Sequence, residues 1–160
     1  MEAMETQKAP DNPGVIAIPP LLYIGMLLVA LIAQHFYPIT YVPEFLHIKA
    51  GVLLISISLP IAGSAVWQMR RAHTAIDVRK PTNAIVTQGI FRFSRNPMYL
   101  SLTLLYLGLS TLMNSAWGLI GIVPLLVLMQ RGVIAREERY LEKKFGAQYL
   151  WYKKRVRRWI

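Results

Sequence analysis

The chain has 160 residues, the length of one domain, and contains no cysteine, which excludes disulfides, thiolate metal sites and a cysteine nucleophile. It is 54% hydrophobic with a mean hydropathy of +0.38, yet its formal net charge is +10. Soluble domains rarely combine these values, whereas small membrane proteins with basic flanks do so naturally. A nucleic-acid-binding role would leave the long uncharged tracts unexplained, so we expect no nucleic-acid partner.

The first half of the chain predicts a tail and two membrane-spanning helices. Residues 1–14 lack the basic segment of a secretory signal and are expected to form a flexible tail. Within residues 15–69, two uncharged stretches, 15–34 and 50–69, each have the length that crosses a hydrocarbon core about 30 Å thick. Pro19-Pro20 should delay or distort the first helix, and Pro60 should kink the second.

Residues 70–97 read as a long loop without a helical period, ending in the segment FRFSRNP. Loops of this length are uncommon unless they are functional or disordered, and the aromatic and β-branched content argues against disorder. Two interpretations stay open from the residues alone. One is an ordered cytoplasmic loop that contributes to a pocket, and the other is an interfacial loop in which Phe91 and Phe93 enter lipid.

The uncharged tract from Asn96 to Gln130 predicts a helical hairpin over residues 98–130. A single helix over this tract would be about 50 Å long, too long to cross a bilayer once. Asn114-Ser115 near its middle is good turn chemistry. Two short transmembrane helices meeting at this turn are therefore expected.

Basic residues are concentrated in two segments. Six of the eighteen Lys and Arg lie between Arg70 and Arg95, and ten lie between Arg131 and Arg158. The positive-inside rule places both segments and both termini in the cytoplasm, with the chain in the plasma or inner membrane if it is prokaryotic. The fold class expected is an all-α integral membrane protein with four transmembrane helices, a cytoplasmic amphipathic helix and an ordered loop.

Residues 131–160 begin with that amphipathic helix, which carries an unusual pair of carboxylates. Ile134, Leu141 and Phe145 share one helical face, and Glu137 and Glu138 fall on the same stripe. Burying a carboxylate costs on the order of several kcal/mol unless cations or hydrogen bonds compensate. We favour a buried pair that faces a ligand.

The alternative is that Glu138 and Glu142 form exposed pairs with neighbouring arginines. Gly146 is well placed to end the helix. The following YLWYKKRVRRWI interleaves aromatic and basic residues, and we expect most of this tail to lie at headgroup depth on anionic lipid.

Two ordered sets of residues resemble a known family. IVTQGIFRFSRNPMYLS, the hairpin and then EERYLEKKFGAQYLWYKKRV resemble the membrane-embedded methyltransferases of the isoprenylcysteine carboxyl methyltransferase and phospholipid N-methyltransferase group. The resemblance covers about residues 81–158. It implies S-adenosylmethionine as the cofactor, the lipid bilayer as the surroundings, and a lipophilic or small methyl acceptor, most of all a carboxylate of the isoprenylcysteine type. No metal site is expected.

The resemblance also implies the site residues. The cofactor contacts that it implies in the loop and at the hairpin entry are Gln88, Gly89, Asn96, Pro97, Tyr99 and Leu100, and Glu137 and Glu138 are the acidic contacts. Arg95, Tyr99 and Glu138 are the residues that it implies for catalysis, with Arg95 orienting the acceptor.

One departure from the family pattern stands inside this motif. The family has His where this chain has Asn96, and asparagine cannot act as an acid or base near neutral pH. This stretch is therefore expected to bind and orient rather than to move protons. Two other functions stay open: an NADPH-dependent enzyme similar to sterol reductases, and a non-catalytic lipid-binding membrane protein.

Overall fold

The computed structural model describes residues 11–160, so residues 1–10 of the expected tail lie outside the described residues. The described part of the chain is helical and contains no strand. The helices are α1 (Pro19–Phe36), α2 (Glu44–Arg71), α3 (Pro97–Leu112), α4 (Ala116–Leu128), α5 (Ala135–Phe145) and α6 (Ala147–Arg155). A short 3₁₀ helix, η1 (Gly89–Arg92), precedes α3, and a π-helical segment, η2 (Met129–Ile134), joins α4 to α5.

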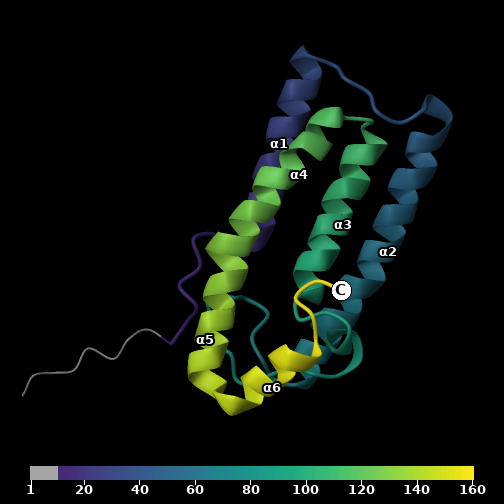
Figure 1. Cartoon of the computed structure of the whole chain (residues 1–160). Coiled ribbons are helices and arrows are strands. Elements are labelled where there is room, and N and C mark those ends of the chain that lie inside the picture. Colours follow the sequence, from purple (N-terminus) through teal and green to yellow (C-terminus); the bar gives the residue numbers. More distant parts are fainter. Residues whose placement is uncertain (1–10) are drawn as a thin grey trace, which may run out of the picture.

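Helices α1 to α4 form an up-and-down bundle in which α2 packs along α3 and α1 packs along α4 (Figure 1). Three helical stretches are long and apolar enough to cross a membrane: α1, α2 and the continuous helix Ala116–Phe145. Helix α3 is a shorter apolar helix beside them. The prediction of an all-α integral membrane protein is confirmed.

The first two helices differ from the uncharged tracts at their ends. Helix α1 begins at Pro19, because the proline pair has no N–H to give and suits a first helical turn. Helix α2 runs beyond its apolar tract at both ends and keeps Pro60 in its interior. Gly51 lets α2 approach α3 closely, since a Cβ there would lie 2.9 Å from the Gly108 carbonyl oxygen.

The hairpin turn lies between α3 and α4, at the expected Asn114-Ser115. Asn114 adopts a left-handed backbone conformation, with φ of +48°. Its side-chain oxygen accepts hydrogen bonds from the backbone N–H groups of Tyr41 (3.2 Å) and Val42 (3.0 Å). The turn therefore also fixes the connection between α1 and α2.

The backbone is continuous helix at the division expected between the hairpin (98–130) and the segment 131–160. Helix α4 continues through η2 into α5 without a loop. The wider π-helical turn keeps the backbone bonded across this region, where Gly132 also accepts a hydrogen bond from the N–H of Ile16 at 3.2 Å. The amphipathic helix is thus continuous with a membrane-spanning one.

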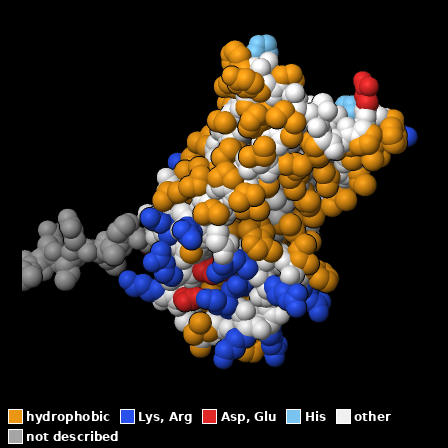
Figure 2. All heavy atoms as spheres, turned by 45° about the horizontal axis from the view of Figure 1, so that its top comes forward, with side chains coloured by type: hydrophobic (Ala, Val, Ile, Leu, Met, Phe, Trp, Pro, Cys, Tyr) orange, Lys and Arg blue, Asp and Glu red, His pale blue; other side chains and the backbone are white. Residues whose placement is uncertain are grey.

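Charge and apolar surface separate along the molecule (Figure 2). Lys and Arg gather at the end formed by α5, α6 and the α2–α3 connection, while hydrophobic side chains cover most of the rest of this face. Large apolar side chains on α1 and α2, among them Val29 and Leu53, point outward and are more than half exposed. A lipid-facing bundle with one basic end accounts for both features.

Candidate active site

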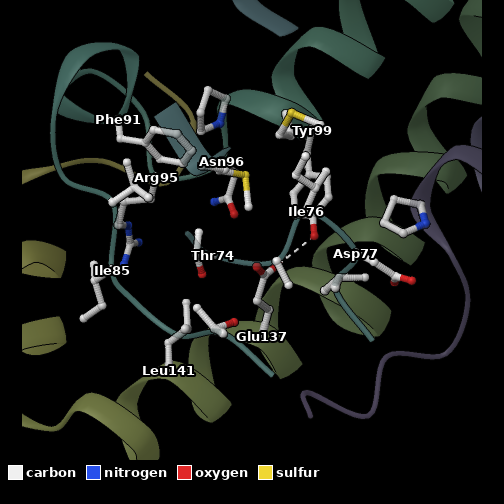
Figure 3. A pocket seen from close by; sticks show the side chains of 18 of the residues that line it. Thr74, Ile76, Asp77, Ile85, Phe91, Arg95, Asn96, Tyr99, Glu137 and Leu141 are labelled. Atoms are coloured by element: carbon white, nitrogen blue, oxygen red, sulfur yellow. Dashed lines mark hydrogen bonds between the residues drawn. The ribbon is translucent and has the colours of Figure 1, made fainter. Parts of the chain in front are cut away.

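A cavity of about 430 Å³ opens at the basic end of the bundle (Figure 3). Its walls come from the start of α1, the connection between α2 and α3, the start of α3, and helices α5 and α6. Most of the lining is apolar, and Ile76, Ile85 and Leu141 contribute to it. Arg95, Glu137 and Glu138 add charges of both signs.

The segment before α3 is held in place by the C-terminal tail. The carbonyl oxygen of Arg158 accepts hydrogen bonds from Asn96 Nδ2 (2.9 Å) and Ser94 Oγ (3.3 Å). The backbone N–H of Arg95 donates to the carbonyl of Arg157 at 3.0 Å. The end of the tail therefore docks against the protein, whereas the sequence led us to expect most of it on lipid.

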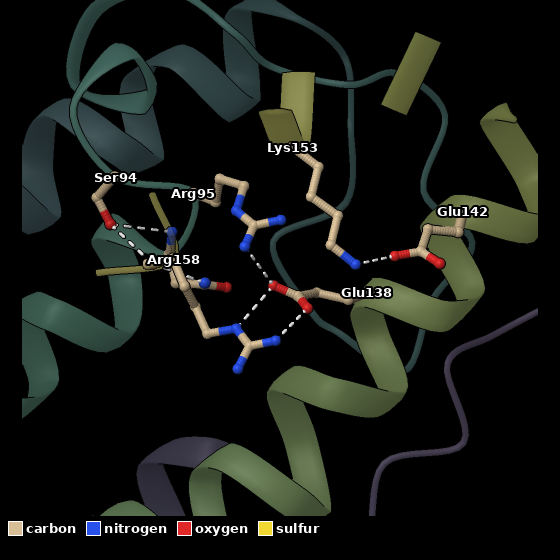
Figure 4. Close-up of polar contacts among 7 residues, drawn as sticks. Ser94, Arg95, Glu138, Glu142, Lys153 and Arg158 are labelled. Carbon is tan, nitrogen blue, oxygen red and sulfur yellow. Dashed lines mark hydrogen bonds and ion pairs between the residues drawn. The ribbon is translucent and has the colours of Figure 1, made fainter. Parts of the chain in front are cut away.

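Glu138 is the centre of a buried cluster with two arginines (Figure 4). Arg158 donates from Nε to Oε1 (3.0 Å) and from Nη2 to Oε2 (2.6 Å), and Arg95 Nη2 lies 3.1 Å from Oε1. The side chains of Glu138 and Arg95 are only 6% and 8% exposed. The hydrogen bonds from Arg158 raise the pKa of that guanidinium further, so it stays charged. The alternative of exposed pairs with neighbouring arginines does not hold for Glu138, and the partly exposed Glu142 pairs with Lys153 instead of an arginine.

Arg95 has hydrogen-bonding capacity left over. Its Nε and Nη1 atoms are buried and have no hydrogen-bond partner among the described residues. A buried, unpaired donor costs about 1–3 kcal/mol, and more when it is charged. The Arg95 side chain borders the cavity, but these two atoms have almost no accessible surface, so a ligand with acceptor oxygens would pair with them only after neighbouring side chains shift.

Glu137 contacts a different partner. The Tyr99 hydroxyl donates a hydrogen bond of 2.6 Å to Glu137 Oε2, next to the cavity (Figure 3). Adjacent positions on a helix differ by about 100°, which explains why the two neighbouring carboxylates have separate partners. One carboxylate is thus left facing the cavity with a single hydroxyl, while the other is fixed by arginines.

Two tyrosines of α6 line the cavity, although the sequence led us to expect most of this tail, apart from Arg155 and Tyr152, at headgroup depth. Tyr149 and Tyr152 are 2% and 4% exposed, and Tyr152 donates to the carbonyl of Phe91 at 2.7 Å. Burial is the main cause that raises the pKa of both hydroxyls above the usual range, so both stay protonated. The sequence pattern that could have indicated this burial is their spacing, because residues three apart lie on the same face of a helix.

The N-terminal segment also packs beside the cavity, which sequence patterns did not indicate. The Tyr140 hydroxyl donates to Asp11 at 2.7 Å and accepts from the N–H of Thr82 at 3.2 Å. Lys144 pairs with the same aspartate at 2.7 Å. Three segments that are distant in sequence therefore meet on α5.

The structure brings together most of the residues expected in the site. Arg95, Asn96, Pro97, Tyr99, Glu137 and Glu138 all line the cavity. Gln88 and Gly89 are exposed and line a separate hollow with Trp67 and Arg71, near the end of α2. Leu100 is half-buried in α3 and lies outside the set that lines the cavity. Contact of these last three residues with a cofactor stays a prediction.

Fold and site together define a small integral membrane protein with a charged cavity next to its membrane-spanning helices. The phospholipid methyltransferase family matches residues 46–148, and the chain belongs to this family. The general function that the family carries is that of a membrane methyltransferase. The matched range includes the cavity loop, the hairpin and both glutamates, and it ends before the C-terminal tail.

One relative has been compared directly. An uncharacterized protein of Haemophilus influenzae is 41% identical over 63 residues, which cover 39% of this chain and 100% of that protein. No solved structure matches this chain.

Proposed function

We propose that the protein transfers a methyl group from S-adenosylmethionine to an acceptor bound in the cavity. The observation that carries this proposal is the combination, in one buried site, of an arginine with unpartnered donors and a separate carboxylate. The family match supports methyl transfer, and the cavity supports a ligand that carries both charges.

The residues present fit this cofactor. Its amino-acid part has one carboxylate and one ammonium group, and its sulfonium adds a second positive charge. A binding site therefore needs both acidic and basic side chains. Glu137 can hold a cationic group, and the apolar walls suit an adenosine moiety. When bound, the cofactor supplies an activated methyl group.

The protein's own contribution is alignment and exclusion of water. An in-line transfer needs donor and acceptor held at close range, which can supply a large part of a rate enhancement. Tyr99 orients Glu137 through its hydrogen bond, and Glu138 orients Arg95 through its ion pair. Asn96 holds the tail rather than a proton, so these residues bind and orient.

The acceptor that we propose is a lipophilic carboxylate of the isoprenylcysteine type. A carboxylate is already ionised at neutral pH and needs no general base, and a guanidinium can orient it through two hydrogen bonds. The cavity lies at the end of the apolar bundle, next to the expected bilayer, and the basic end faces the cytoplasm in this proposal.

Calorimetry with S-adenosylhomocysteine on the purified protein tests the cofactor. We expect the wild type to bind. Tyr99→Phe should lower the affinity by a factor of about ten or more, because a hydrogen bond to a charged group is lost. The matched control is Tyr106→Phe, which removes a hydroxyl bonded to the Gly118 carbonyl in the bundle core. Absence of binding, or binding of NADPH instead, would contradict the proposal.

A screen with a radiolabelled methyl donor in membranes tests the acceptor. Carboxylate, amine and thiol acceptors are compared for the wild type and Arg95→Ala. We expect labelling of a prenylated cysteine carboxylate that Arg95→Ala abolishes. Labelling of an amine that is insensitive to Arg95→Ala would retain methyl transfer and refute the carboxylate acceptor.

A further inference from the structure

The cluster around Glu138 contains one carboxylate and two guanidinium groups, and they share it unequally. Arg158 engages both oxygens of Glu138 through Nε and Nη2. Arg95 approaches only Oε1, at 3.1 Å, and keeps two nitrogens without partners. The cluster therefore carries one excess positive charge. The unpartnered donors belong to Arg95, whose side chain borders the cavity although these two nitrogens are closed off from it until neighbouring groups shift.

This unequal sharing depends on Arg158. A carboxylate and a guanidinium form their strongest pair as a fork with two parallel hydrogen bonds. Glu138 already forms such a fork with Arg158, so it cannot turn its second oxygen toward Arg95. If Arg158 were absent, the same carboxylate would be free to take the donors of Arg95.

We propose that Arg158 is a positioning residue that keeps Glu138 from capturing Arg95, and so keeps Arg95 available for a ligand carboxylate. The inference rests on the proposed function for the identity of that ligand. The carboxylate could come from the amino-acid part of the methyl donor or from the acceptor, and the shared chemistry is a carboxylate on Arg95.

The backbone around Arg158 suits this role. Its carbonyl is bonded to Ser94 and Asn96, on either side of Arg95, so the guanidinium of Arg158 is placed by the same loop that presents Arg95. Trp159 packs against the hydrophobic core and anchors the tail. The Arg158 side chain is 31% exposed against 8% for Arg95, so solvent can reach the arginine that forms the fork with Glu138, while the buried arginine keeps unpartnered donors.

A double-mutant cycle separates this role from a purely structural one. The proteins are wild type, Arg158→Met, Glu138→Gln and the double variant; methionine keeps an unbranched side chain but offers no donor. Two affinities are measured: that for S-adenosylhomocysteine, with its decarboxylated analogue for comparison, and the KM for a prenylcysteine carboxylate. We expect Arg158→Met to weaken one of the two about tenfold.

The decisive result is whether Glu138→Gln lowers or raises the affinity in each background. Glu138→Gln should weaken binding in the wild type, because Arg95 loses its ion-pair partner. In the Arg158→Met background the same change should instead raise the affinity, up to that of Glu138→Gln alone, because it removes the carboxylate that captures Arg95. Arg158→Lys keeps a charge near Glu138 and should recover part of the affinity, while Lys154→Gln, which removes an exposed cation in the same segment, should change nothing. A double variant that binds worse than either single variant would overturn the inference.

A measurement without ligand tests this inference independently of the proposed function. Thermal unfolding gives the coupling between Arg95→Met and Glu138→Gln, with and without Arg158→Met. We expect a larger coupling when Arg158 is replaced, since Glu138 then pairs with Arg95 alone. Equal couplings overturn the role of Arg158 even if the wild type binds S-adenosylhomocysteine. A wild type that fails to bind that compound contradicts the proposed function and leaves this readout intact.

Discussion

At the scale of single residues, Glu138 and Glu142 illustrate how position decides the worth of an ion pair. They lie one helical turn apart on α5 and carry the same charge. Glu138 is 6% exposed and holds two arginines, whereas the Glu142 side chain is 31% exposed and pairs with a single lysine, Lys153. Buried charge-assisted bonds have no water to replace them, and exposed ones do.

We predict that Glu138→Gln lowers the free energy of unfolding by about 1.5–3 kcal/mol, because charged hydrogen bonds are lost in a buried cluster. The isosteric control Glu142→Gln should cost less than about 1 kcal/mol. Denaturant unfolding of both variants in the same detergent checks this. Equal losses would show that the buried cluster is no stronger than the surface pair.

Asn96 contributes through its side-chain N–H, which holds the C-terminal tail at the Arg158 carbonyl. We predict that Asn96→Ala costs about 1 kcal/mol and exposes the tail, whereas Asn96→His, the family residue, can still donate a hydrogen bond and should largely preserve docking. The rate of tryptic cleavage after Arg157 measures docking directly. Unchanged cleavage in Asn96→Ala would refute this function of the side chain.

At the scale of helices, the contact between α2 and α3 depends on small residues. A Cβ on Gly51 would lie 2.6 Å from the Leu112 side chain and 2.9 Å from the Gly108 carbonyl oxygen, whereas a Cβ on Gly63 of the same helix meets nothing within 4 Å. Small residues let helices pack closely in a membrane, where no hydrophobic force drives them together.

Gly51→Ala is therefore expected to lower stability by about 1–3 kcal/mol through overpacking. Gly63→Ala should be neutral or stabilise the helix by up to about 1 kcal/mol, because alanine is the better helix former. Thermal unfolding in detergent compares the two. A Gly51→Ala protein as stable as Gly63→Ala would mean that α2 and α3 can separate without cost.

Hydropathy was sufficient to predict the membrane-spanning elements, because uncharged tracts of this length have few alternatives. The turn at Asn114 and the start of α3 after Asn96 followed from local residue chemistry. Local patterns could not distinguish the docked tail from a tail on lipid, since aromatic and basic residues suit both. Its position depends on hydrogen bonds between residues 94–96 and 157–158, which are distant in the chain.

The same limit applies inside the site. The stripe on α5 predicted buried carboxylates, and both line the cavity. Their partners could not be derived, because Arg158 reaches Glu138 only after the chain turns at Gly146 and α6 folds back. The separation of Gln88 and Gly89 from the cavity likewise arises from the path of the loop, which no periodicity describes.

At the scale of the whole molecule, the basic end and the opposite end are expected on different sides of the membrane. The absence of cysteine makes the natural chain a ready background for labelling. We predict that Lys154→Cys, at an exposed site on α6, reacts with a membrane-impermeant maleimide only after permeabilisation. Thr40→Cys, exposed between α1 and α2, should react in intact cells. The reverse pattern would place the cavity outside.

The continuous helix from Ala116 to Phe145 also connects the membrane-spanning part of the protein directly to the cavity. A span adjusts its tilt to the thickness of the hydrocarbon layer, and a loop after α4 would have absorbed that adjustment. Because no loop intervenes here, we expect a change in tilt to move the part of the helix that carries Glu137 and Glu138, less any bending at Pro124 or η2. We therefore expect membrane thickness to change the spacing of the charged groups, so that lipid chain length would tune this site.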